Sequence, residues 1–179
     1  MIESGIKHFG LAKRKAAAKY GVRSAGALPS NAQIQECLAE RQRIFEPNAH
    51  EGRLADLRRA ALTIMDELAA FRPRLVGAVL AGTPTINSSI ELHVFADAPE
   101  AVRDHLELRG TAVKDAQRRY RFGNQKIVQV PGFTFAFGTE QVEVMTFPEN
   151  GAREAPLSPV DQRPMRPAGR EQGAALLAG

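Results

Sequence analysis

Residues 80–97, LAGTPTINSSIELHVFAD, are the stretch on which the prediction of the fold depends most. A short apolar run ends at Gly82-Thr83, a polar loop follows, and an alternating strand then carries Glu91 and His93. Because the side chains of a strand point to opposite faces in turn, Glu91 and His93 share one face while their apolar neighbours enter the core. The stretch therefore offers either a ligand site or a hairpin with two polar residues on its solvent face.

A second strand pattern, QVEVMTF at residues 141–147, repeats this alternation. Glu143 and Met145 share one face, and the residues on either side of them share the other. If the two strands are neighbours in a sheet, Glu143 joins Glu91 and His93 in one acidic cluster. The pair of strands is thus the place where we expect the functional residues.

The segments around these strands alternate between helical and extended patterns. A capping box, in which the Gln33 side chain reaches back to Ser30, predicts the start of one helix. Apolar residues at helical spacing predict helices over residues 30–46, 50–70 and 98–109, and an Ala- and Lys-rich stretch that ends at Gly21 predicts one over residues 4–20. Short runs between turn residues predict strands over residues 75–81, 90–95, 111–114, 118–122, 126–130, 133–137 and 141–147. We therefore predict an α+β fold with a mixed, mainly antiparallel sheet and helices packed on one face.

The chain divides into three parts by composition. Residues 1–29 are rich in Ala and Lys and predict a helical arm followed by a linker. Residues 30–147 hold the predicted α+β domain. Residues 148–179 form a tail rich in Pro and Arg, which predicts an extended segment lying over the domain or a disordered one.

The overall composition is that of an ordinary globular protein with a slightly basic balance. The 179 residues are enough for one domain with a proper core, and 44% of them are apolar. The formal charge of +4 favours phosphate-bearing partners without requiring them. Cys37 stands alone and cannot form an internal disulfide, and no stretch approaches the roughly 18 apolar residues of a membrane span. We therefore expect a cytoplasmic protein with no membrane partner.

The motifs on the two strands resemble the polymerase-beta-like nucleotidyltransferase superfamily. The matching pieces are Leu80-Ala81-Gly82-Thr83, Glu91-Leu92-His93 and Glu143, within residues 50–147. The resemblance implies a nucleotidyltransferase-like domain that binds a nucleoside triphosphate with a divalent metal, Mg or Mn. It also implies transfer of a nucleotidyl group to an acceptor. RNA and a protein are the two alternatives for that acceptor.

The resemblance assigns roles to individual residues. Gly82 and Thr83 form the turn that approaches the phosphates, because a glycine leaves no side chain in the way. Glu91 and Glu143 are the metal ligands, and together with His93 in an altered metal or base role they form the catalytic set.

A second phosphate-binding element is expected on the strand 118–122. Arg119 and Arg121 share one face of this strand, and guanidinium groups bind phosphate through paired N–H donors. An exposed edge strand protected by charge would carry the same residues. Both interpretations stay open at the level of sequence.

The sequence departs from the family pattern at one ligand position. The family places two acids on the first strand, whereas this chain has Glu91 followed by His93, and imidazole is a poor magnesium ligand. The other register, Ser89 and Glu91, also keeps one acid only. The site therefore uses manganese, recruits Asp97 or Asp161, or has lost catalysis. In the last case the chain is an inactive module that binds nucleotide, RNA or a protein.

Overall fold

The computed structural model describes residues 9–22, 28–45, 47–85 and 87–178. The first residues of the predicted N-terminal helix and most of the predicted linker lie outside these ranges. The helices are α1 (Phe9–Tyr20), α2 (Asn31–Phe45), α3 (Pro47–Glu67), η2 (Ala69–Phe71), α4 (Gly77–Ala81), α5 (Pro99–Glu107), η3 (Glu149–Arg153) and α6 (Arg170–Ala178). The strands are β1 (Arg74–Val76), β2 (Ile90–Phe95), β3 (Lys114–Arg121), β4 (Ile127–Phe137) and β5 (Glu140–Phe147).

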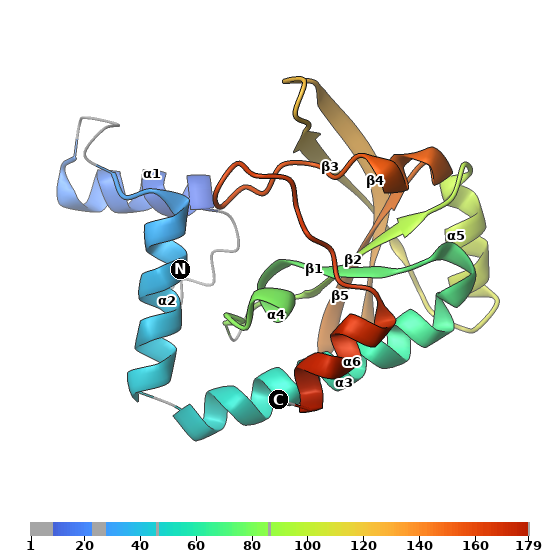
Figure 1. The fold of residues 1–179 in the computed structure, drawn as a ribbon, viewed down its shortest axis with the longest axis horizontal. Coiled ribbons are helices and arrows are strands. Elements are labelled where there is room, and N and C mark those ends of the chain that lie inside the picture. The colour runs from blue at the N-terminus through green and yellow to red at the C-terminus, as the bar shows by residue number, and fades with distance from the viewer. Residues whose placement is uncertain (1–8, 23–27, 46, 86, 179) are drawn as a thin grey trace.

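The strands form a five-stranded sheet in the order β1-β2-β5-β4-β3. The β2 and β5 strands pair in parallel, whereas all the other neighbours are antiparallel. Figure 1 shows this sheet with α3 and α5 beside it and the orange to red C-terminal segment running back across it. The predicted α+β class with a mixed, mainly antiparallel sheet is confirmed.

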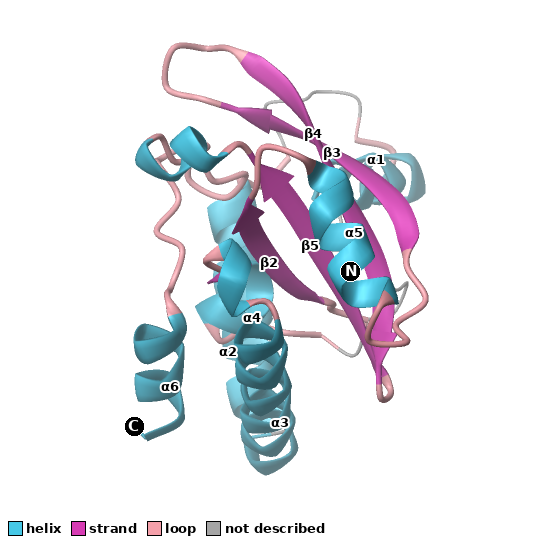
Figure 2. Ribbon diagram, turned by 90° about the vertical axis from the view of Figure 1, so that its right-hand side faces the viewer, coloured by secondary structure: helices cyan, strands magenta, loops and turns pink. Residues whose placement is uncertain are grey.

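The main core lies on the sheet face that α3 and α5 cover. The predicted apolar stripe of α3 supplies Leu57, Ala61 and Ile64, which are fully buried. The inward residues of β2, including Leu92, pack against this stripe because alternation places them on the same face. Figure 2 shows α3 and α5 on the viewer's side of the sheet, with α1 behind it.

A smaller cluster lies on the opposite face of the sheet. It contains Phe95, Tyr120, Met145 and Phe147, with Met165 of the tail packed against them. This is the face that carries Glu91 and His93. The tail, rather than a helix, is therefore what covers the apolar part of this face.

Two sequence expectations about the first strand and the hairpin are wrong in detail. Of the predicted strand 75–81, β1 covers only the start, because Gly77 has a φ of +72° that ends the extended backbone before the short helix α4. The four strands predicted between residues 111 and 137 are two long ones, β3 and β4. Pro131 does not interrupt β4, since the ladder with β5 begins only at Gly132.

The predicted capping box is present as expected. The Ser30 N–H donates to Gln33 Oε1 at 2.8 Å, and the Gln33 N–H donates to Ser30 Oγ at 3.1 Å. Helix α2 therefore begins at a fixed point beside the sheet. None of the helices in the described ranges is both long and apolar enough to cross a membrane.

Residues 154–168 of the tail form a strap across the second face of the sheet. At one edge, the Leu157 N–H donates to the carbonyl of Arg121 at 2.7 Å. At the other edge, Leu75 and Ala168 exchange two backbone hydrogen bonds of 2.8 and 2.9 Å. The strap is therefore held at both edges of the sheet, and helix α6 continues from it onto α3 through the Arg170–Asp66 ion pair.

Candidate functional site

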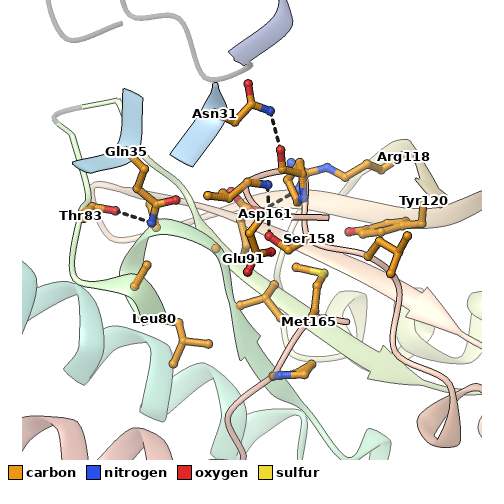
Figure 3. Close-up of a pocket in the computed structure, with 18 of the residues that line it drawn as sticks. Asn31, Gln35, Leu80, Thr83, Glu91, Arg118, Tyr120, Ser158, Asp161 and Met165 are labelled. Atoms are coloured by element: carbon orange, nitrogen blue, oxygen red, sulfur yellow. Dashed lines mark hydrogen bonds and ion pairs between the residues drawn. The ribbon is translucent and has the colours of Figure 1, made fainter. Parts of the chain in front are cut away.

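A cleft of about 890 Å³ lies between the second face of the sheet, helix α2 and the tail strap. Its floor is formed by the β1–α4 junction and by β2, β3 and β5. Asn31 and Gln35 of α2 form one wall, and Ser158 and Asp161 of the strap form another (Figure 3). Asn31 donates a hydrogen bond to the carbonyl of Pro159, which joins the two walls.

Glu91 and Glu143 lie side by side on the cleft floor. They are partners in the parallel ladder between β2 and β5, and both line the cleft. Alternation along two parallel strands in register places their carboxylates on the same face. The structure therefore brings together the two carboxylates that the sequence singled out, although they are far apart in the chain.

The guanidinium group of Arg118 lies between these two carboxylates. Its Nη1 donates to Glu91 Oε2 at 2.6 Å, and its Nη2 donates to Glu143 Oε2 at 2.5 Å. Burial would lower the pKa of Arg118, but its interactions with Glu91 and Glu143 raise that pKa above its ordinary value. The guanidinium group of the Glu91–Arg118–Glu143 triad therefore stays charged.

Tyr120 and His93 support the triad from below. The Tyr120 hydroxyl interacts with Arg118 and lies 3.0 Å from His93 Nε2. The His93 ring is 2% exposed and contacts the ring of Phe147 at a centroid distance of 4.6 Å. Burial, and secondarily the charge of Arg118, lower the pKa of His93 to about 3. His93 is therefore a neutral residue under the site and does not line the cleft.

The glycine that lets the floor close up is Gly77 rather than Gly82. A Cβ built on Gly77 would lie 2.8 Å from the carboxyl carbon of Glu91, so only a glycine leaves room for this carboxylate. A Cβ on Gly82 would meet nothing nearer than the Arg58 side chain at 3.7 Å. Both glycines have a positive φ, +72° and +73° respectively.

This difference predicts different outcomes for two alanine substitutions. Both Gly77→Ala and Gly82→Ala should lose about 1–2 kcal/mol of stability through the left-handed backbone. Gly77→Ala should in addition displace the Glu91 carboxylate from Arg118, because the new methyl group occupies its position. Chemical denaturation measures the stability, and a crystal structure or the NMR signal of the Arg118 side chain measures the displacement. Equal effects of both substitutions on the Arg118 signal would contradict this account.

The Gly82-Thr83 turn is placed differently from the expectation. The N–H groups of Gly82 and Thr83 donate to the carbonyls of Val79 and Ala78, where they close helix α4. Thr83 lines the cleft, and its Oγ1 accepts a bond from Gln35 Nε2 at 3.4 Å. Gly82 itself does not line the cleft, and its carbonyl contacts His50. Only the Thr83 side of the turn therefore faces the candidate site.

Arg119 and Arg121 alternate with Arg118 and Tyr120 along β3. Both are exposed, and both border the cleft at its β3 edge. Because alternate side chains point to opposite faces, they project away from the face that carries Glu91. The structure therefore does not place their guanidinium groups beside the carboxylates.

The carboxylates do not form a convincing site for a divalent metal. Two acids face the floor, each of them is ion-paired with Arg118, and the position between them holds a guanidinium group. In the described parts of the chain, no group of three or more His, Cys, Asp or Glu side chains could hold a metal ion. Asp161 accepts a hydrogen bond from the Arg163 N–H of its own turn, and Asp97 accepts one from the Glu149 N–H. Neither alternative acid therefore completes a metal site.

Arg118 and Tyr120 had no role in the sequence interpretation, and Ser89 had a role only in the alternative register. The alternation of the strand 118–122 places Arg118 and Tyr120 on one face and Arg119 and Arg121 on the other. The sequence interpretation assigned phosphate binding to the second pair, whereas the structure places the first pair on the cleft floor. Ser89 lines the cleft one alternation before Glu91, which favours the Ser89–Glu91 register over Glu91–His93. No local pattern pointed to the walls formed by α2 and the strap, because they reach the site from distant parts of the chain.

Comparison with models of known protein families, with curated proteins and with solved structures finds no match to this chain.

Proposed function

We propose that this chain is a catalytically inactive module that binds a nucleotide in the cleft between the sheet, α2 and the strap. The observation that carries this proposal is the Arg118 guanidinium between Glu91 and Glu143 at the cleft floor. The chain resembles a nucleotidyltransferase in the order of its motifs, and an arginine lies where such an enzyme would need a metal.

The size and lining of the cleft support a nucleotide as the ligand. About 890 Å³ falls within the usual range of small-molecule sites. Side chains that can donate hydrogen bonds line it, among them Asn31, Gln35 and Ser158. Apolar surface from Leu38 and Val160 lies beside these polar groups, which suits a ligand with both a flat ring and polar substituents.

The charges around the cleft also support an anionic ligand. Four arginines line or border it against three carboxylates, a formal balance of +1 (4 − 3 = 1). The arginines are Arg118, Arg119, Arg121 and Arg166, and the carboxylates are Glu91, Glu143 and Asp161. This small excess attracts a phosphate group to the rim, while the triad on the floor keeps its own charges paired.

A blocking substitution tests the binding site directly. Val160→Trp places a large ring in the cleft from the strap, and should weaken the binding of fluorescent nucleoside triphosphates at least about tenfold, which is about 1.4 kcal/mol. Leu108→Trp adds the same ring just after α5, at a position that is 88% exposed, and should leave binding unchanged. Fluorescence anisotropy in the presence of EDTA, Mg²⁺ or Mn²⁺ measures both variants. Nucleotide binding that is absent in the wild-type protein, or equal in both variants, contradicts the proposal.

Nucleotidyl transfer is the second candidate function. The register that sets Glu91 beside Glu143 at the cleft floor is the observation that favours it. Its test is incubation of the protein with labelled nucleoside triphosphates, Mg²⁺ or Mn²⁺ and cell extract, beside Glu91→Ala and Glu143→Ala variants. The inactive module predicts no transfer above that of the two variants. Label transfer that depends on both carboxylates would replace the first proposal by this one.

A further inference from the structure

We propose that Arg118 is the resident cation of this site, fixed by Tyr120 and His93, and that it makes ligand binding in the cleft independent of divalent metal. This inference rests on the proposed function for the identity of the ligand. Its central claim, the exclusion of a metal from the carboxylate pair, concerns the protein alone and is tested without nucleotide.

The first step is the match between the guanidinium group and the two carboxylates. A guanidinium presents several N–H donors in a rigid plane, so two of its nitrogens can each serve a different acceptor. Here Nη1 and Nη2 each bond to one carboxylate, at 2.6 and 2.5 Å. Charge-assisted bonds of this length are among the strongest in proteins. A divalent cation would have to displace both of them to reach the same oxygens.

The second step is the support that Tyr120 and His93 give to Arg118. The Tyr120 hydroxyl interacts with Arg118 and is hydrogen-bonded to His93 Nε2 at 3.0 Å. His93 is enclosed by the rings of Tyr120 and Phe147, with centroid distances of 5.3 and 4.6 Å. The enclosed His93 ring therefore holds the Tyr120 hydroxyl beside Arg118. This arrangement gives His93 a positioning role in place of the metal or base role that the sequence suggested.

The third step is the close approach of the backbone at Gly77. The carboxyl group of Glu91 lies against Gly77, where a Cβ would be 2.8 Å away. The carboxylate is thereby confined between Gly77 and the guanidinium group. Glu91 is thus held in a geometry that suits one planar donor rather than the octahedral shell of a hydrated Mg²⁺.

Binding of Mn²⁺ alone tests the inference. The wild-type protein should show no Mn²⁺ binding that depends on Glu91 and Glu143. Arg118→Met removes the cation and leaves two neighbouring carboxylates, and should tighten Mn²⁺ binding at least about tenfold, or about 1.4 kcal/mol. Lys114→Met removes one positive charge from an exposed position of the same strand, and should have no such effect. Electron paramagnetic resonance of free Mn²⁺ and isothermal titration calorimetry provide the measurement.

Further variants keep the result interpretable. Adding Glu143→Gln to Arg118→Met should abolish the gained affinity, which assigns it to the carboxylate pair. Arg118→Gln serves as a second variant if Arg118→Met does not fold. The wild-type titration overturns the inference by itself if Mn²⁺ binds and this binding is lost in Glu91→Gln and Glu143→Gln. Equal Mn²⁺ binding by the wild-type protein and both Arg118 variants also overturns it.

The nucleotide experiments separate this inference from the proposed function. If nucleotide fails to bind but the Mn²⁺ results hold, the proposed function is wrong and the resident cation stands. If nucleotide binds equally in EDTA and in Mn²⁺, both are supported. If nucleotide binds only with Mn²⁺ and needs both carboxylates, the resident cation is wrong while the cleft remains the nucleotide site.

Discussion

Replacing Arg118 with methionine should lower the free energy of unfolding by about 2–3 kcal/mol at neutral pH. The substitution removes the guanidinium group that pairs with both Glu91 and Glu143, which lie next to each other. Their side chains are 24% and 16% exposed, so water screens the repulsion only in part. The lower end of the range allows for this partial exposure. Urea denaturation followed by circular dichroism measures the change.

Two companion variants separate charge from packing in this experiment. The triple variant Arg118→Met, Glu91→Gln, Glu143→Gln removes all three charges and should regain most of the lost stability, because no uncompensated carboxylate remains. Lys114→Met should stay within about 0.5 kcal/mol of the wild-type protein, as is usual for exposed substitutions. An Arg118→Met variant as stable as Lys114→Met would mean that the triad contributes nothing to the fold.

Acidification below pH 6.5 should destabilise the protein, and His93 is the reason. Its pKa is lowered to about 3 in the folded protein, chiefly by burial, against 6.5 for an ordinary histidine. Between these two values the unfolded chain binds a proton that the folded protein does not. The free energy of unfolding therefore falls as the pH drops below 6.5, by up to about 1.4 kcal/mol per pH unit from this group. Above pH 6.5 the contribution is constant.

The matched variants are His93→Gln and His105→Gln. Chemical denaturation at pH 7.5, 6.5, 5.75 and 5.0 gives the slope of stability against pH. His93→Gln should be less stable at pH 7.5, because it disturbs the bond with Tyr120, but should show a smaller slope. His105 bonds to the Glu67 carbonyl at 2.8 Å away from the site, so its variant should keep the wild-type slope. Parallel curves for the wild-type protein and His93→Gln would refute the assignment.

Local patterns predicted most of the fold. The Ser30–Gln33 capping box, the stripe of α3 and the alternation of β2 each depend on residues close in sequence, and each is present in the structure. The stretch 75–81 was misread because a seven-residue apolar run suits a buried strand and a buried helix equally. Only the left-handed backbone of Gly77 distinguishes the two structures. The φ angle of a glycine cannot be derived from its place in a sequence.

The candidate site was harder to predict because its decisive contact joins three strands. Alternation placed Glu91 and Glu143 on one face, and the parallel pairing of β2 with β5 sets them side by side. The same period offered Arg118 or Arg119 for the face of β3, and nothing local chooses between them. The choice depends on which face of β3 continues the carboxylate face, and that follows from the register with β4 and β5.

The tail strap has a consequence for folding during synthesis. The strands precede the strap in the chain, so a nascent chain can form the sheet before the strap crosses its second face. Until Met165 packs against them, Met145 and Phe147 lack the cover that the strap gives this face. The pairing of Ala168 with Leu75 then closes the molecule after the sheet is complete. The wall of the cleft that the strap forms is thus added after all five strands, when Ala168 pairs with the first strand.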